Sequence, residues 1–316
     1  MAYEGGDSVT RRAALAWLGA PLLASAAAEP KQPRLIRLVV RATSAEPLDP
    51  KAFKVTVEHS NAAVVRVLTP EDPQMLLIVL DLTGDLGAIE PAKAALIAEI
   101  GRLPAATYVS VMRAQDGLSV MVDPTPDREP VTNAIRDLTI SGRPGLLDVL
   151  EPVGRLADGI ARKAQVRVAV LHVSDSDVQL YREDFTNPVI NSSDPHDLSR
   201  RFPETLIQEK MNKFEGRFLA LQTPAHLVQL AYRSDRLSEA YQNGLQRLTE
   251  DVNGSAVFCR SRAEIGDAIA AAFASIRSEY GLIVAVPEKA PEVAVIKVAA
   301  GDTTLPSRAR LKIKEK

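Results

Sequence analysis

The sequence is poor in cysteine, in aromatic residues and in net charge. Cys259 is the single cysteine among 316 residues, so neither an intramolecular disulfide nor a thiolate metal site can form. It ends the apolar stretch 256–259, where we expect a buried core residue. The net charge of −2 gives no electrostatic reason to expect nucleic acid or an anionic membrane as a partner.

Motifs of the common enzyme classes are missing as well. The histidines, at positions 59, 172, 196 and 226, show none of the pairings typical of a zinc site, and we expect His172 to lie in the core. No glycine-rich phosphate loop follows a strand pattern, and there is no Gly-x-Ser-x-Gly turn for a serine nucleophile. The sequence therefore offers no catalytic residue.

The first 28 residues have the pattern of an export signal. Thr10-Arg11-Arg12 precedes an apolar stretch at 13–23 that is too short for a full transmembrane helix, and small residues follow at 24–28. The arginine pair resembles a twin-arginine signal, and an ordinary secretory signal or an uncleaved anchor is the alternative. We expect a periplasmic or extracellular protein with no transmembrane segment beyond the signal.

Two apolar runs end on acidic residues. Residues 76–80 lead into Asp81, Thr83 and Asp85, and residues 166–173 lead into Ser174 and Asp175. Such runs are typical of parallel strands that are buried on both faces. Because ligands of open α/β sheets bind at the carboxyl ends of the strands, we expect these polar residues to share one site.

Strand and helix patterns alternate between residues 76 and 280. We expect strands at 76–82, 107–113, 118–122, 166–173, 217–221 and 255–259, and helices at 91–103, 129–138, 146–163, 206–214, 237–252 and 263–280. Gln115-Asp116-Gly117 predicts a hairpin turn between the second and third of these strands. The pattern predicts an α/β fold with a mostly parallel sheet, one antiparallel edge strand and helices on both faces.

Further strand patterns flank the α/β segment, at 35–41 and 53–68 before it and at 282–286, 293–298 and 309–313 after it. We expect the turn between the two strands of 53–68 near Asn61-Ala62. Neither set has enough strands to be stable alone, so we predict one small β domain into which the α/β domain is inserted. The predicted divisions are a signal peptide at 1–28, N-terminal β strands within 29–72, the α/β domain at 73–280 and C-terminal strands within 281–316.

Short motifs occur in a characteristic order along the mature chain. Residues 142–150 are similar to a Gly-Gly-Thr-Ala-Leu-Tyr-Asp-Ala-Leu helix start, and residues 170–177 to a Leu-Leu-Ser-Asp-Gly strand end. Residues 48–55, 245–258 and 278–282 match further segments of the same pattern. With this order, the chain resembles the bacterial VWFA-related secreted proteins. The resemblance implies a Rossmann-like von Willebrand factor type A domain that binds proteins.

The resemblance also implies a metal-ion-dependent adhesion site, which the family builds from Asp-x-Ser-x-Ser, a Thr and an Asp. Here the positions are Asp81, Thr83 and Asp85, then Pro144 in place of the Thr, then Asp175. Oxygen ligands of this kind suit Mg²⁺ or another divalent cation. We therefore expect a degenerate site with Asp81, Thr83, Asp85 and Asp175 as metal ligands, beside the alternative that no metal binds.

Together these features predict an exported, non-enzymatic protein-interaction module of the adhesion or scaffold type. One alternative is a Mg-dependent hydrolase that uses the acidic cluster, for which Arg143 is the one candidate to grip a phosphate. Another is a structural envelope protein whose site is vestigial. The long segment 179–201 follows the third loop of the site and would shape or cover the binding face; an inert insertion is its alternative.

Overall fold

The computed structural model describes residues 34–41, 47–178 and 203–313. The predictions for the export signal at 1–28 and for the segment 179–201 lie outside these residues. Across the described ranges, no helix combines the length and the apolar character that crossing a membrane needs.

The predicted α/β class is confirmed by a six-stranded sheet. Its order is β6-β5-β4-β7-β8-β9, and every neighbouring pair is parallel except β5 with β6. Counted from β4 as the first strand, the order is 3-2-1-4-5-6, that of doubly wound α/β folds. The strands are β4 (Gln74–Asp81), β5 (Thr107–Arg113), β6 (Ser119–Thr125), β7 (Arg167–Ser174), β8 (Ala225–Gln229) and β9 (Ala256–Phe258).

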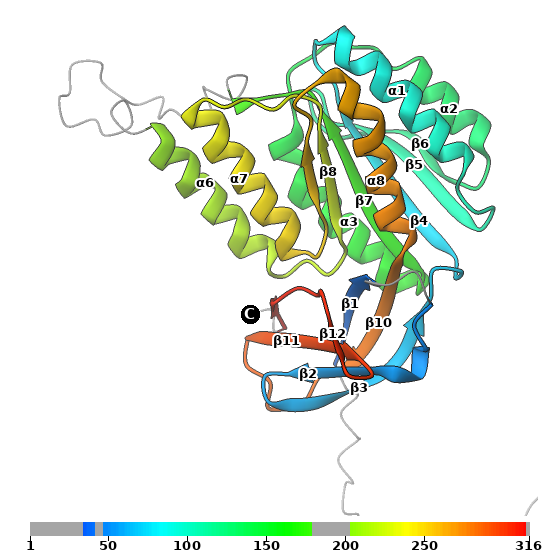
Figure 1. Ribbon diagram of the computed structural model, residues 1–316, viewed down its shortest axis with the longest axis vertical. Coiled ribbons are helices and arrows are strands. Elements are labelled where there is room, and N and C mark those ends of the chain that lie inside the picture. The colour runs from blue at the N-terminus through cyan, green and yellow to red at the C-terminus, as the bar shows by residue number, and fades with distance from the viewer. Residues whose placement is uncertain (1–33, 42–46, 179–202, 314–316) are drawn as a thin grey trace, which may run out of the picture. The chain divides into compact units, whose positions relative to one another are not determined.

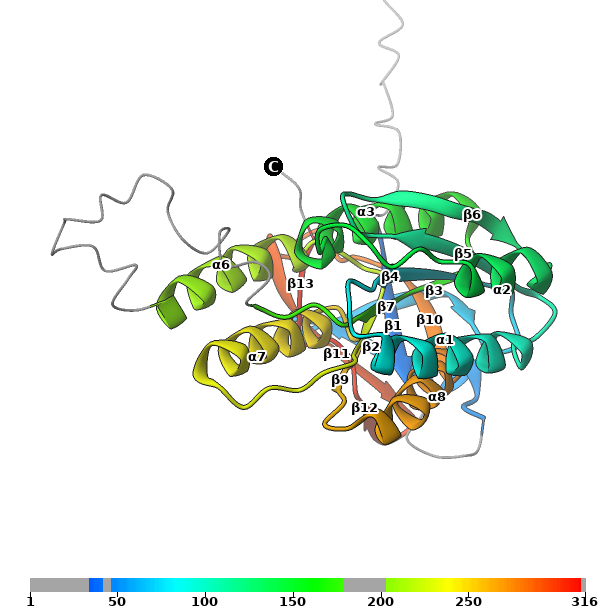
Figure 2. The same ribbon diagram turned by 90° about the horizontal axis from the view of Figure 1, so that it is seen from above.

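Helices cover both faces of this parallel sheet. Apolar residues of α1 (Leu86–Gly101), α2 (Arg128–Arg136) and α8 (Ile265–Arg277) pack in one core. Those of α3 (Leu146–Ala164), α6 (Pro203–Phe218) and α7 (Arg236–Asp251) pack in the other. Figure 1 shows α1 beside α8 and α6 beside α7, and Figure 2 shows the same pairs from above.

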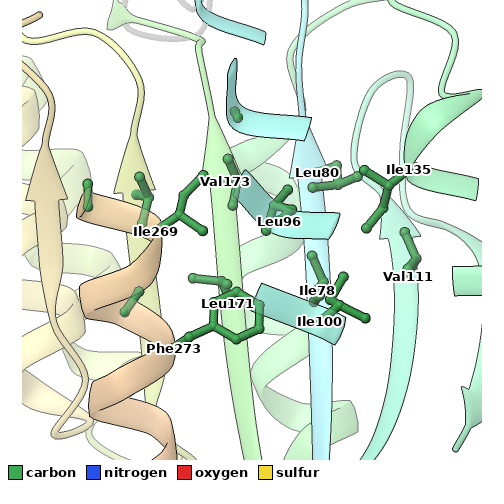
Figure 3. Close-up of a cluster of buried hydrophobic side chains, with 14 of the residues drawn as sticks. Ile78, Leu80, Leu96, Ile100, Val111, Ile135, Leu171, Val173, Ile269 and Phe273 are labelled. Carbon is green, nitrogen blue, oxygen red and sulfur yellow. The ribbon is translucent and has the colours of Figure 1, made fainter. Parts of the chain in front are cut away.

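The unbroken apolar run of β4 follows from this arrangement. Ile78 and Leu80 point into the first core, where Figure 3 shows them with Leu96 and Ile100 of α1. Leu77 lies between them in sequence and packs in the second core. Because successive side chains of a strand point to opposite faces, both sets must be apolar when both faces are covered.

A second sheet is formed by strands from the two ends of the described chain. Its order is β1-β10-β3-β2-β11-β12, with β13 also paired to β11, and all its pairs are antiparallel. The strands are β1 (Leu35–Arg41), β2 (Phe53–Val57), β3 (Ser60–Leu68), β10 (Glu279–Ala285), β11 (Val293–Ala300), β12 (Thr303–Leu305) and β13 (Arg310–Lys312). The described residues belong to one compact unit, and the predicted division at 72 and 280 stays a prediction.

Three sequence predictions of local structure were wrong. The strand expected at 217–221 is the end of α6 and the loop after it, and the strand that follows α6 is β8. The turn between β2 and β3 lies at Glu58-His59, where Glu58 has a φ of 54°. The helix expected to reach residue 280 ends at Arg277, and Glu279 already starts β10. The first error concerns a short apolar segment whose periodicity fits either a strand or a helix. The other two concern element boundaries, which a sequence pattern places less well than the elements themselves.

Candidate functional site

The predicted site residues meet at the carboxyl edge of β4 and β7. Asp81 is paired in register with Ser174, and the amide of Asp175 donates a hydrogen bond of 3.2 Å to the carbonyl of Asp81. Thr83 and Asp85 follow in the loop between β4 and α1. The adjacency of the two acid-tipped strands therefore brings these four residues close together.

Asp81 is fully enclosed and bound by protein donors. Its Oδ1 accepts the amide of Gly145 at 2.9 Å, and its Oδ2 accepts the amide of Leu146 at 3.2 Å and the hydroxyl of Ser176 at 2.6 Å. Burial raises the pKa of Asp81, and the hydrogen bonds from Ser176, Gly145 and Ser174 oppose that rise. The amides belong to the start of α3, where the helix dipole favours a negative charge. Asp81 thus anchors α3 to the end of β4.

Asp175 binds the loop that follows β4. Its Oδ1 accepts the amide of Thr83 at 2.6 Å and the hydroxyl of Thr83 at 3.0 Å. Its Oδ2 accepts the amides of Gly84 at 2.9 Å and Asp85 at 3.0 Å. A carboxylate offers about four lone-pair sites, so these four donors use the full capacity of the group. The loop 83–85 is therefore wrapped around a single side chain of the neighbouring strand.

Asp85 has different hydrogen-bond partners from the other two acids. It caps α1 by accepting the amide of Gly87 at 3.0 Å, and Arg262 donates to the same oxygen at 3.2 Å. The side chain of Asp85 is 50% exposed and that of Arg262 is 66% exposed. The pair joins the start of α1 to the short 3-10 helix at Arg262–Glu264, on the solvent side of the edge.

The second loop of the site is fixed by Gly145 and not by Pro144. A Cβ on Gly145 would lie 1.9 Å from the carbonyl oxygen of Ala114, so only glycine fits here and its amide can reach Asp81. The amide of Arg143 donates to Asp116 at 2.9 Å, which holds the start of the loop. Pro144 contributes neither a hydroxyl nor an N–H at the position where the resemblance implies a threonine.

Comparison with known proteins gave matches among solved structures only; no family model and no curated protein matches the sequence. Solved von Willebrand factor type A domains are similar to this chain. A von Willebrand factor type A protein from Catenulispora acidiphila is 12% identical, with 89% of this chain and 73% of that chain covered and a TM-score of 0.44.

Two further structures come from pilus proteins. The vWF domain of the type V pili tip protein Mfa5 from Porphyromonas gingivalis is 13% identical, with 66% of this chain and 96% of that chain covered and a TM-score of 0.44. A mutant of the PilB minor pilin from Streptococcus sanguinis is 9% identical, with 66% and 62% covered and a TM-score of 0.46. The order and direction of the strands are the evidence for the fold.

The residues of this edge, as arranged here, do not fit a divalent cation. Mg²⁺ needs several oxygen ligands that converge with free lone pairs. Here Asp81 and Asp175 accept hydrogen bonds on both oxygens, and Asp85 is directed to Gly87 and Arg262. Within the described residues, no group of three or more His, Cys, Asp or Glu side chains is placed to hold a metal. The assignment of Asp81, Thr83, Asp85 and Asp175 as metal ligands stays a prediction.

Sequence reasoning missed the polar groups that complete the site. Ser176 is buried, and its hydroxyl lies 2.7 Å from that of Ser174 while it donates to Asp81. Gln229 at the end of β8 is also buried and donates to the carbonyl of Ser176. The available signal was a polar residue directly after an apolar strand, next to an acid on the neighbouring strand.

Cys259 and His172 are core residues, as expected, and His226 is buried as well. Cys259 is 1% exposed, and burial raises the pKa of its thiol to about 11, so it is not a reactive nucleophile at neutral pH. The pKa of His172 is lowered to about 3, mainly by burial and to a smaller extent by the charge of His226. His226 Nε2 lies 2.9 Å from Glu279 Oε1 in a buried pair. The His172 Nδ1 has no hydrogen-bond partner in the part of the chain that the structure describes.

Proposed function

We propose that this chain is an exported, non-enzymatic protein-interaction module that binds its partner at the carboxyl edge of the parallel sheet without a metal ion. The observation that carries the proposal is the saturation of Asp175 by four donors from residues 83–85. In this arrangement a side chain of the protein holds the loop in the way that a bound cation would. The partner would therefore meet a preformed surface, which reduces the entropy lost on binding.

The exposed residues of the edge are suited to a protein partner. Leu86 is 60% exposed at the first position of α1 and lies next to the ion pair of Asp85 with Arg262. An apolar side chain beside charged groups is typical of the centre and rim of a protein interface. Arg143 on the second loop is also exposed and adds a further charged contact.

The hydrolase alternative gains no support from the geometry. A general base or a nucleophile must reach the substrate, and Asp81 is 1% exposed with both oxygens bound by the protein. Export by way of residues 1–28, and insertion of the α/β domain at 73–280 into a small β domain, are further parts of the proposal.

Calorimetric titration tests the metal-independent part. Full-length protein and an Asp81→Ala variant would be titrated with Mg²⁺ and with Mn²⁺. We expect no binding heat in either protein, because the carboxylates are already bound by the chain. Saturable heat in the wild type that is lost in the variant would contradict the proposal and support the metal site.

Photocrosslinking tests the interaction surface. A photoreactive amino acid would replace Leu86, and the matched control would carry it at Leu156, which is 41% exposed on α3. In intact producing cells we expect discrete crosslinked protein bands from position 86 and not from 156, with equal yield after chelation of divalent cations. Crosslinks that vanish on chelation would contradict metal independence, and equal bands at both positions would contradict the edge as the interface.

A further inference from the structure

A second candidate site is a cationic pocket that does not belong to the acidic edge. It has a volume of about 310 Å³ and is lined by the charged side chains of Arg34, Arg155, Arg162, Arg217 and Lys312. These residues come from the segment before β1, from α3, from the end of α6 and from β13. We call this set the cationic pocket. The fold brings these five side chains together from four segments that are distant in the sequence.

Part of this positive charge is not neutralised locally. Arg155 and Arg217 share Glu151, at 2.7 and 2.9 Å, so two cations have one carboxylate between them. Lys312 pairs with Glu292 at 3.3 Å. Among the described residues, no carboxylate lies within 4.0 Å of the guanidinium of Arg34 or Arg162.

The one acid that lines the pocket does not cancel the excess. Asp158 is buried, and its oxygens accept the amide of Gln222 at 3.0 and 3.1 Å and the amide and hydroxyl of Thr223 at 2.8 and 2.7 Å. It therefore faces the loop between α6 and β8. Five lining cations against Asp158, Glu151 and Glu292 leave an excess of two positive charges at the pocket, in a chain whose net charge is −2.

We propose that the cationic pocket binds a small anion that carries two or more phosphate or carboxylate groups. Guanidinium groups bind both kinds of oxyanion through pairs of parallel N–H donors, and Arg34 and Arg162 have such donors to offer. The volume suits a small organic ligand. A nucleic acid would require an extended basic stripe, and the low net charge of the chain gives no sign of one.

The site is separate from the proposed protein-binding edge. Asp81 binds the first turn of α3, at Leu146, whereas Arg162 lies in the last turn of the same helix. Arg162 comes 16 positions after Leu146, which corresponds to about 24 Å along the helix axis. Anion binding here does not depend on whether the edge binds a partner or a metal.

Isothermal titration of the full chain with pyrophosphate and with citrate tests the inference. The test variant is Arg34→Gln with Arg162→Gln, and the matched control is Arg136→Gln, an exposed arginine on α2. We expect a dissociation constant below about 1 mM for at least one anion in the wild type and the control, weakened about tenfold or more in the double variant. The affinity should fall with added NaCl, because the binding is electrostatic.

The two anions distinguish the chemistry. Binding of pyrophosphate alone assigns the pocket to phosphate groups, binding of citrate alone to carboxylates, and binding of both to oxyanions in general. The inference is overturned if neither anion binds below about 1 mM, or if the double variant binds as the wild type does. Unchanged thermal unfolding of the variants would show that a loss of binding is not a loss of the fold.

Discussion

Asp175 accepts both the amide and the hydroxyl of Thr83, at 2.6 and 3.0 Å, with a single carboxylate oxygen. In the sequence the two residues stand 92 positions apart, at the ends of neighbouring strands. Their contact makes the loop after β4 dependent on the strand end of β7. The stability of this edge of the sheet therefore depends on the Asp175 carboxylate.

Replacing Asp175 tests this dependence. Asp175→Ala removes the acceptor of four hydrogen bonds, and we expect the free energy of unfolding to fall by about 2–4 kcal/mol, because bonds to a charged group are the stronger ones. Urea denaturation followed by circular dichroism measures the change. The control is Asp85→Asn, which keeps a capping side chain and should stay within about 0.5 kcal/mol. Equal effects of the two substitutions would contradict the role given to Asp175.

Gly145 offers a steric test of the second loop. In Gly145→Ala the new Cβ would lie 1.9 Å from the Ala114 carbonyl oxygen, a backbone atom that cannot move freely. We expect a loss of about 2–4 kcal/mol in the free energy of unfolding. Gly84→Ala is the matched control, since its Cβ would meet nothing within 4 Å. A stable Gly145→Ala protein would show that α3 can start elsewhere.

His172 predicts a pH dependence of stability. Its pKa falls from 6.5 to about 3 on folding because burial disfavours the charged ring. Between these values the unfolded chain binds a proton that the folded chain does not bind. The folded state is therefore destabilised as the pH falls below 6.5, by about 1.4 kcal/mol per pH unit for this one group.

The measurement compares urea midpoints at several pH values in the wild type and in His172→Leu. The variant should show a shallower loss of stability toward acid pH, even if it is less stable at neutral pH. His59→Gln is the control, because His59 is exposed and its removal should leave the slope unchanged. Identical slopes for wild type and His172→Leu would rule out this assignment.

Replacing Arg308, in the C-terminal segment, should strongly lower the free energy of unfolding. Its guanidinium is buried and donates to the carbonyls of Leu219, Leu221 and Arg310, and burial lowers its pKa to about 10. Arg308→Met would remove these three hydrogen bonds, although the Leu219 carbonyl would keep the amide of Lys312, and we expect the free energy of unfolding to fall by about 2–4 kcal/mol. The control is Arg310→Met, which replaces an exposed side chain and should change the free energy of unfolding by about 0.5 kcal/mol or less. Thermal unfolding of both variants distinguishes the two.

The fold was largely predictable because its signals are long and regular. The apolar run of β4 is continuous, and the apolar residues of α3 recur with the helical period over several turns. The positions of both elements in the structure agree with the prediction. The segment 217–221 was assigned wrongly, since Phe218 and Leu221 are buried and a short apolar run does not distinguish a helix end from a strand.

The sequence predicted which acidic residues lie together at the site, but not the hydrogen bonds that they accept. That Asp81 and Asp175 would lie together followed from two parallel strands that end on acids. The donors they bind are mostly backbone amides, and amides have no sequence signature. Gly145 shows the same limit, because the requirement for glycine comes from Ala114, a residue 31 positions earlier in the chain.

Strand β10, which connects β1 to the rest of the antiparallel sheet, is synthesised late. Strand β10 lies between β1 and β3, and its first residue, Glu279, is paired with Arg41, 238 positions earlier. All strands of the mostly parallel sheet, β4 to β9, leave the ribosome before β10 does, while β1 and β3 still lack the strand that lies between them. The parallel sheet can thus assemble during synthesis before the antiparallel sheet, which needs β10 to join β1 to β3. A chain truncated before Glu279 would keep every strand of the first sheet and expose the edges of the second.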